Sequence, residues 1–345
     1  MINTYSPIGN PYVATLMDGI SSLTDDVKWH YDLDFFWSDG IFDMDIIHTH
    51  WLSFMTASET EVERFRQRIK EIKEKGIKIV ATVHDLERPS FKSELENIFY
   101  EIVYDNADVF IHLGAYSKKL FEQHYPNVRH VLIPHHVHDH LYPEIPNRDV
   151  SLRKLHLSNR KKYILCFGSF RDEEEQKMVE NLATEVRKQG MEVIAPHFFL
   201  LNNYMNCYYK FRRKAKMRLW QLLYGIHIYG WDISNEQLPY FFGAADVVLL
   251  QRKKILNSGN LPLAFLMGKV CIGPNIGNVG SILTETGNPT FDPSSTDSLY
   301  LAVKEGFRLA EAGKGQQNRE YALCHWSTDN ISAEIYHLYQ SILAD

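Results

Sequence analysis

Several features of secreted and membrane proteins are missing from this sequence. Its start, Met1-Ile-Asn-Thr-Tyr-Ser-Pro, has neither the positive charge nor the apolar run of a signal peptide. No apolar stretch approaches the roughly 20 residues that span a bilayer. The few cysteines (Cys166, Cys207, Cys271 and Cys324) lie far apart, which argues against a disulfide framework or a cysteine metal site. We therefore expect a cytoplasmic protein with buried free thiols.

The sequence also lacks an excess of positive charge. Its net charge of −6 argues against general nucleic-acid binding. Apolar residues make up 45% and charged residues 23%, an ordinary composition for a folded chain. A length of 345 residues exceeds the ~150 of a typical domain, so two domains are expected.

The most informative stretch that is present spans residues 246–283. An apolar strand, Val247–Leu250, leads through the basic triplet Arg252–Lys254 to a small polar turn, Asn257–Asn260. An apolar helix and a second strand, Val270–Gly273, follow. This order predicts a parallel strand–helix–strand unit, in which the loops at the carboxyl ends of the strands hold ligands.

The basic triplet and the polar turn are the candidate binding residues of that unit. They are Arg252, Lys253, Lys254, Asn257, Ser258, Gly259 and Asn260. Free N–H groups at a helix start, with cations nearby, suit an anion such as a phosphate. The alternative is that Asn257 and Ser258 only cap a core helix while the cations are solvated.

Strands and helices also alternate in the first half of the chain. Apolar strands are predicted at 45–51, 78–83, 107–113 and 128–134, a mixed one at 27–37, and helices at 59–75, 93–104 and 117–125. This alternation predicts a doubly wound, mainly parallel sheet. The strand ends carry His48, His50, His84 and Asp85.

The chain opens with a turn, Gly9-Asn10-Pro11, before a helix predicted at 12–23. Gly9 and Asn10 could let a ligand approach the backbone, or they could be only a turn. The second half repeats the alternation, with strands at 163–167, 192–195 and 227–229 and a helix at 174–189. A loop of Gly168, Ser169, Phe170 and Arg171 follows its first strand.

The predicted organisation is a Rossmann-like domain at 1–140, a linker at 141–159, and a second Rossmann-like domain at 160–328. A C-terminal helix at 329–345 has Ile331, Ile335, Leu338 and Ile342 on one face. We expect this helix to dock on an apolar surface, for which the first domain is the candidate.

The order and spacing of several short segments resemble those of the GT-B glycosyltransferases, nearest to bacterial enzymes of capsule, exopolysaccharide or lipopolysaccharide assembly. The segments are Asp45-Ile-Ile-His-Thr-His-Trp51, Val80-Ala-Thr-Val-His-Asp85, Ala107-Asp-Val-Phe-Ile-His112, Leu132-Ile-Pro-His135, Leu165-Cys-Phe-Gly-Ser169 and Ala245-Asp-Val-Val-Leu-Leu250. The resemblance implies two Rossmann-like domains facing across a cleft, an acceptor on the first and a nucleotide-sugar, such as a UDP- or GDP-sugar, on the second.

The resemblance also assigns roles. Gly168, Ser169 and Arg171 match one diphosphate loop, and Arg252–Lys254 and Asn257–Asn260 match the other. Such cations and helix starts stabilise the leaving diphosphate without a metal or other cofactor. Arg171 could instead be a solvated charge beside the acids 172–175.

The sequence departs from the family in one respect. Retaining members of one branch carry two glutamates where this chain has Asn257 and Phe265. Either the transfer inverts the anomeric centre, the alignment is shifted, or the chain is not catalytic. An inverting transfer needs one general base, for which His84 and Asp85 are the candidates. His50 is then a residue of the acceptor side.

Two other segments draw attention. His135, His136, His138 and His140 form a cluster that we assign to the interdomain loop, because they lack a firm metal-ligand spacing.

Residues 204–224 carry six Lys and Arg with no acid, beside a helical stripe of Tyr204, Tyr208, Phe211, Ala215, Leu219 and Leu222. This helix could contact an anionic membrane surface, or the stripe could pack on the second sheet.

The sequence therefore predicts a glycosyltransferase that moves a sugar from a nucleotide donor to a glycan or lipid-linked acceptor, with inversion. Two alternatives stay open. One is a catalytically silent relative that binds a nucleotide-sugar or a partner protein, and the other is a nucleotide-sugar epimerase.

Overall fold

The computed structural model describes residues 11–30, 33–52, 58–85, 94–199, 207–229 and 233–344. By its internal contacts the chain divides into two compact units. The first comprises Met1–His138 together with His325–Asp345, and the second comprises Asp139–Cys324. Each unit contains one sheet in which every strand pair is parallel.

The sheet of the first unit runs in the order β1-β2-β3-β4. Its strands are β1 (Ile46–Thr49), β2 (Lys78–Val83), β3 (Val109–His112) and β4 (Arg129–Leu132). Its helices are α1 (Tyr12–Leu23), α2 (Leu33–Trp37), α3 (Glu59–Glu74), α4 (Glu94–Tyr104), α5 (Ala115–His124) and α14 (Thr328–Ala344), with the 3₁₀ helix η1 (Asp39–Asp43). The strand predicted at 27–37 is wrong, because Leu33–Trp37 forms α2.

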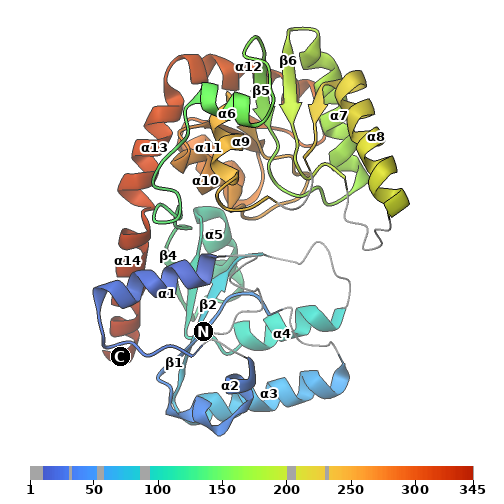
Figure 1. The fold of residues 1–345 in the computed structure, drawn as a ribbon. Helices are drawn as coiled ribbons and strands as arrows, with labels where there is room; N and C mark the ends of the chain where they lie inside the picture. Colours follow the sequence, from blue (N-terminus) through green and yellow to red (C-terminus); the bar gives the residue numbers. More distant parts are fainter. Residues whose placement is uncertain are drawn as a thin grey trace. The chain divides into compact units, whose positions relative to one another are not determined.

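Helices cover both faces of this first sheet (Figure 1). On one face, Val109 and Ile111 of β3 pack in one apolar cluster with α1 and α14. On the other, Phe110 of β3 contacts Phe121 of α5 at 5.2 Å and Tyr104 of α4 at 5.4 Å between ring centroids. Both faces of β3 are thus buried, which explains its uninterrupted apolar sequence.

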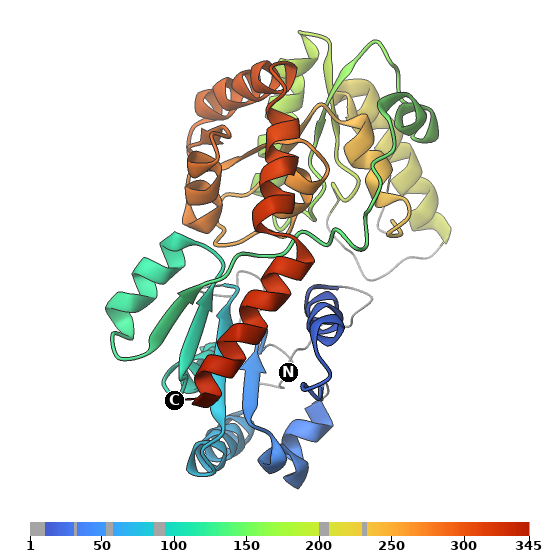
Figure 2. The same cartoon turned by 90° about the vertical axis from the view of Figure 1, so that its left-hand side faces the viewer.

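The C-terminal helix returns to the first unit, as predicted. Ile331, Ile335, Leu338 and Ile342 are all buried in the cluster that α14 shares with α1 and the sheet. Figure 2 shows α14, in red, alongside the strands of this unit. A Cβ on Gly19 of α1 would lie 2.2 Å from Ser332 Oγ, so this glycine permits the close approach of the two helices.

The sheet of the second unit runs in the order β10-β9-β8-β5-β6-β7. Its strands are β5 (Lys162–Leu165), β6 (Met191–Ile194), β7 (Ile226–His227), β8 (Val247–Leu249), β9 (Val270–Pro274) and β10 (Thr290–Phe291). Counted along the chain within the unit, the order is 6-5-4-1-2-3, that of the Rossmann fold.

Eight helices are described in this second part of the chain. They are α6 (Arg148–Lys154), α7 (Glu173–Arg187), α8 (Cys207–Tyr224), α9 (Leu238–Ala244), α10 (Asn260–Leu266), α11 (Gly277–Glu285), α12 (Thr296–Glu311) and α13 (Lys314–His325). Apolar residues of α7, α8 and α12 share one cluster with the sheet. Helix α9 packs on β5, and α10 and α11 pack on β9.

Residues 141–159, predicted as a linker, fall within the second unit and contain α6. The Asn147 side chain caps this short helix by accepting a hydrogen bond from Val150 N at 2.9 Å. Cys166 and Cys271 are buried free thiols, whereas Cys324 is exposed, contrary to the expectation of burial.

Candidate functional site

The topology of the second sheet singles out one position for a ligand. Strands β5 and β8 lie side by side, and the chain continues from them toward opposite edges of the sheet. Ligands of open α/β sheets bind outside the carboxyl ends of the strands at such a switch point. The segments that leave β5 and β8 there are residues 166–172 and 250–259, which contain the predicted diphosphate loops.

Polar contacts join these two segments. Gln251 Nε2 donates to the backbone oxygen of Gly168 at 2.7 Å. Arg171 Nη1 donates to the backbone oxygen of Lys254 at 3.0 Å. The structure therefore brings the two loops together as one surface at the switch point.

Gly168 is the tightest point of this surface. A Cβ at this position would lie 2.8 Å from Asn260 Nδ2 and 3.1 Å from Arg252 Nη2. A glycine therefore leaves room for the guanidinium and the amide to converge on one backbone segment. Backbone N–H groups, an amide and a guanidinium at one place are suitable donors for phosphate oxygens.

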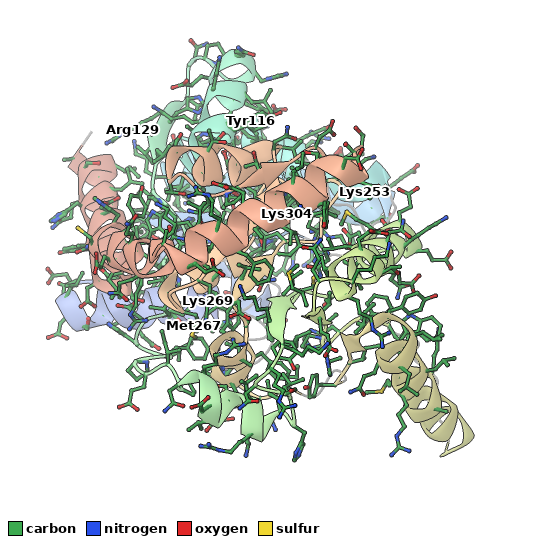
Figure 3. All side chains as sticks on the ribbon, turned by 90° about the horizontal axis from the view of Figure 1, so that it is seen from above. Tyr116, Arg129, Lys253, Met267, Lys269 and Lys304 are labelled. Carbon is green, nitrogen blue, oxygen red and sulfur yellow. The ribbon has the colours of Figure 1, made fainter. Side chains whose placement is uncertain are left out.

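Two of the predicted cations are paired with acids that the sequence analysis did not assign to the site. Arg252 Nη1 lies 2.6 Å from Glu175 Oε2, with side chains 12% and 2% exposed. Lys253 Nζ lies 2.7 Å from Glu174 Oε2, and this pair is more exposed (Lys253 is labelled in Figure 3). The positive charge at the switch point is therefore largely balanced within the protein.

Glu175 organises the first loop. Its backbone N donates to Asp172 Oδ1 at 2.8 Å, and its Oε2 accepts from Arg171 N at 2.9 Å. Burial raises the pKa of Glu175, while the neighbouring Arg252 guanidinium acts in the opposite direction. Burial likewise lowers the pKa of Arg252. The three-residue spacing from Asp172 to Glu175 is that of a helix capping box, a signal by which the sequence could have identified this residue.

The polar turn 257–260 is held by the next loop. Asn257 Oδ1 accepts a hydrogen bond from Asn278 Nδ2 at 2.8 Å, and Val279 N donates to Leu256 O at 3.2 Å. The N-cap of α10 is Gly259, so neither Asn257 nor Ser258 occupies the capping position. Asn278 is fully buried and was not predicted as a site residue.

The two positions that carry glutamates in retaining relatives hold no acid. Phe265 is completely buried in α10, and Asn257 lies in the turn described above. A buried phenyl ring in the core of the helix layer leaves no place for a carboxylate at that position.

A second candidate site lies in the first unit, where His50 and His84 follow neighbouring parallel strands. His50 Nδ1 and His84 Nε2 are 3.0 Å apart, so one ring donates a hydrogen bond to the other. His48 lies two residues earlier, in β1. Its Nδ1 is 2.6 Å from Tyr339 Oη and its Nε2 is 2.7 Å from Thr82 Oγ1. The structure thus groups the predicted strand-end histidines.

Aromatic rings enclose this histidine pair. Trp51 stacks on His84 with 3.9 Å between centroids, and the Tyr12 ring meets His84 edge-on at 5.2 Å. Burial lowers the pKa values of His50 and His84 well below the ordinary value, and their histidine neighbours add to the effect. Burial lowers the pKa of His48 to about 3. All three rings are therefore neutral at pH 7.

The remaining predicted residues of the first unit are less defined. Asp85 follows β2 and is half-buried. Gly9 and Asn10 lie outside the described residues. Tyr12 and Tyr339 were not predicted, although Tyr339 falls on the buried face of α14 at helical spacing from Ile335 and Ile342.

The described side chains of α8 distinguish in part between the two alternatives for this helix. Side chains of this helix are described from Ala215 onward, and Met217, Trp220 and Tyr224 pack on the sheet cluster. Leu219 is 47% and Leu222 71% exposed, so this part of the predicted stripe does not pack on the sheet. Within the described chain, no helix is both long enough and apolar enough to span a bilayer.

Comparison with known proteins identifies the fold. No family model matches the sequence, and a search of curated proteins gives no match. Sucrose-phosphate synthase from Thermosynechococcus elongatus, a solved structure, is 14% identical over 99% of this chain and 81% of its own, with a TM-score of 0.66.

Two further structures agree. HepE from Anabaena, in complex with UDP-glucose, is 14% identical over 88% of this chain and 80% of its own, with a TM-score of 0.63. The catalytic domain of starch synthase IV from Arabidopsis thaliana, bound to ADP and acarbose, is 10% identical over 87% of this chain and 73% of its own, with a TM-score of 0.61. The fold is that of the GT-B glycosyltransferases, as the sequence predicted.

Proposed function

We propose that this protein transfers a sugar from a nucleotide-sugar to a glycan or lipid-linked acceptor in the synthesis of a surface polysaccharide. The observation that carries the proposal is the convergence of Gly168, Arg252 and Asn260 at the switch point of a Rossmann sheet. This is where the fold binds nucleotides, and the donors there suit a diphosphate. Structural relatives solved with UDP-glucose and with ADP support a nucleotide-linked donor, which we take to be a UDP- or GDP-sugar.

In this proposal Gly168, Ser169, Arg171, Arg252, Lys253 and residues 257–260 bind the donor. Charge develops on the diphosphate as the bond from C1 to its oxygen breaks, and fixed donors stabilise that charge most when they need no reorganisation. The ion pairs with Glu174 and Glu175 hold Lys253 and Arg252 in place before the donor arrives. No metal ion or other cofactor is required at the diphosphate.

We assign the general base to His84, with Asp85 as the second candidate. In this proposal the His84 imidazole, held by the hydrogen bond between its Nε2 and His50 Nδ1, takes the proton of the acceptor hydroxyl. The hydroxyl oxygen then attacks C1 in line while the diphosphate leaves. His50 accordingly orients His84, and its own role is positional.

The proposal includes inversion of the anomeric centre, which the missing pair of carboxylates supports. A double displacement needs a nucleophile, and Asn257 and Phe265 cannot act as carboxylates. A single in-line displacement needs only the base and the leaving-group site. The product is therefore expected to have the anomeric configuration opposite to that of the donor.

The proposal extends to a membrane contact by α8 at the cytoplasmic face. Leu219, Leu222 and Leu223 are 47%, 71% and 57% exposed, beside the exposed Lys216 and Arg218. Exposed leucines flanked by cations suit the boundary of an anionic bilayer. Such a contact would bring the enzyme to a lipid-linked acceptor.

The test is a transfer assay with UDP- and GDP-sugars and lipid-linked acceptors, without added divalent metal, in which NMR identifies the anomer formed. His84→Asn should lower kcat at least 100-fold, the usual scale for a general base, while nucleotide binding persists. Nucleotide binding with no release or transfer by the unmodified protein would favour the silent alternative. Conversion of the donor to its epimer would favour an epimerase.

A further inference from the structure

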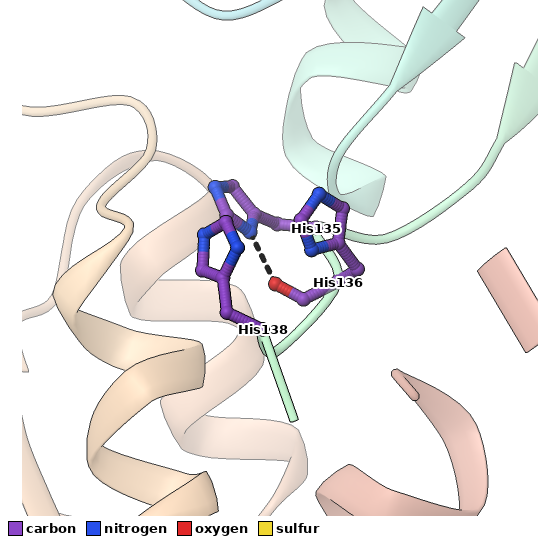
Figure 4. Close-up of side chains that lie close together, drawn as sticks. All are labelled: His135, His136 and His138. Carbon is purple, nitrogen blue, oxygen red and sulfur yellow. Dashed lines mark hydrogen bonds between the residues drawn. The ribbon is translucent and has the colours of Figure 1, made fainter. Parts of the chain in front are cut away.

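Three further histidines at the end of the first unit lie beside the histidine pair described above, and two of them, His135 and His136, contact the same Tyr12 ring. His135, His136 and His138 follow β4, and ligand nitrogens from the three rings all lie within 4.8 Å of one another. Figure 4 shows the three imidazoles gathered around one point of the loop. The sequence pattern His-His-x-His has no helical or hairpin metal spacing, so the backbone conformation is what brings the rings together.

Two backbone carbonyls determine which ring nitrogens of His135 and His136 carry the protons. The oxygen of Tyr12 lies 3.0 Å from His136 Nε2, and the oxygen of His136 lies 2.6 Å from His135 Nδ1. A carbonyl only accepts hydrogen bonds, so these two nitrogens carry the protons. The neutral rings then have their lone pairs on Nδ1 of His136 and Nε2 of His135.

This arrangement is the one that metal-binding histidines adopt in proteins. Their second ring nitrogen almost always donates to a carbonyl or carboxylate, which fixes both the tautomer and the orientation of the ring. The Tyr12 ring adds further support, since it stacks on His136 at 14° with centroids 4.7 Å apart. Tyr12 is itself 1% exposed.

The third histidine has a left-handed backbone. His138 has φ of +58°, in a region that is uncommon for residues other than glycine but that asparagine, aspartate and histidine adopt more often than most. Its Nδ1 is buried and has no hydrogen-bond partner among the described residues. Its ring meets that of His136 edge-on at 4.3 Å. An unsatisfied buried nitrogen beside two other imidazoles is explained if the nitrogen binds a ligand.

We propose that His135, His136 and His138 form a binding site for one divalent transition-metal ion, with Zn²⁺ as the favoured ion. Imidazole nitrogens suit Zn²⁺, Co²⁺, Ni²⁺ and Cu²⁺, whereas Mg²⁺ and Ca²⁺ prefer oxygen ligands. Nitrogens of a tetrahedral zinc site are roughly 3.3 Å apart, so modest side-chain rotation closes the cluster around the ion. Three protein ligands leave a fourth position for water or an anion.

The experiment uses the full chain without a histidine tag, stripped of metal by a chelator and dialysed. Titration with Co²⁺ followed by visible absorption, and with Zn²⁺ by calorimetry, should show one equivalent bound. His138→Asn should weaken the affinity at least 100-fold, because asparagine tolerates the left-handed backbone but supplies no imidazole. His140→Asn is the matched control, since His140 is exposed and lies two residues beyond, and it should bind like the unmodified protein.

Circular dichroism and thermal unfolding of the stripped proteins establish that both variants fold. The proposal is overturned if the unmodified protein binds no Co²⁺ or Zn²⁺, or if His138→Asn binds them as tightly as His140→Asn does. Since metal binding is the readout, failure of the proposed sugar transfer leaves the result unaffected.

Discussion

Arg252 Nη1 and Glu175 Oε2 lie 2.6 Å apart in a buried ion pair that joins the two loops at the switch point of the second sheet. Glu175 belongs to the first turn of α7 and Arg252 to the segment after β8. The folding stability of this region therefore depends on both charges being present. Before any diphosphate binds, the Arg252 guanidinium is held in position by the Glu175 carboxylate.

Removing one member of this pair should be more costly than removing both. In Arg252→Ala the Glu175 carboxylate stays buried without its partner, and the free energy of unfolding should fall by about 3–5 kcal/mol. The double variant Arg252→Ala/Glu175→Ala should recover part of that loss. Urea unfolding measures both, and Lys254→Ala, which removes an exposed charge nearby, is the control. Equal loss in the single and double variants would contradict the coupling.

Gly168→Ala should impair nucleotide binding with little effect on stability. The added methyl group would meet Asn260 Nδ2 at 2.8 Å and Arg252 Nη2 at 3.1 Å, and both are ends of side chains that can move. Their displacement should weaken binding of a nucleoside diphosphate at least tenfold, as calorimetry would measure. Full affinity in this variant would show that the two groups do not converge on the ligand.

The first unit should lose stability in mild acid. Burial lowers the pKa of His48 to about 3, so this ring stays neutral in the folded state while the unfolded chain takes up a proton below its ordinary pKa of 6.5. The contribution of neutral His48 to the free energy of unfolding is complete above pH 6.5 and is lost progressively as the pH falls toward 3. Between pH 7 and 5 the loss is about 2 kcal/mol for such a histidine.

His50 and His84 act in the same direction, since their pKa values are also lowered by burial. Urea unfolding at several pH values, followed by the fluorescence of tryptophans such as Trp51, tests this expectation. The slope of the unfolding free energy against pH is proportional to the number of protons taken up on unfolding. His48→Asn should lower this number by nearly one. A flat profile from pH 7 to 5 would show that these rings are not buried as neutral groups.

The exposed leucines of α8 should support binding to anionic vesicles. Leu222→Ser/Leu223→Ser should lower the partition coefficient on vesicles that contain phosphatidylglycerol by about tenfold or more, because both side chains would leave the apolar phase. Leu301→Ser is the matched control, since Leu301 is 64% exposed on α12. Equal losses in both variants, or no binding by the unmodified protein, would argue against a membrane contact through α8.

Much of the fold could be predicted from the sequence because strands buried on both faces read as continuous apolar runs. The strand at 78–83 and the helix at 12–23 have the bounds expected. The prediction of a strand at 27–37 was wrong because its aromatic residues, Phe35, Phe36 and Trp37, suit either conformation, and local packing selected α2.

The candidate sites were predictable only in part. Parallel strands bring their carboxyl ends to one edge, which is why His50 and His84 could be grouped from their positions. The pairing of Arg252 with Glu175 spans 77 residues, and no local pattern indicates it. The left-handed backbone at His138 could not be predicted either, since only a minority of histidines adopt it.

The most direct test of the central claim measures binding of UDP, GDP and ADP and their sugars by the shift in unfolding free energy. One nucleotide class at a hundred times its Kd should stabilise the protein by about 2.7 kcal/mol. The effect should be lost in Lys253→Ala and Asn257→Ala and kept in Lys304→Ala, which removes an exposed charge of the same kind on α12. Absence of any shift with all these ligands would contradict a nucleotide-sugar site at the switch point of the second sheet.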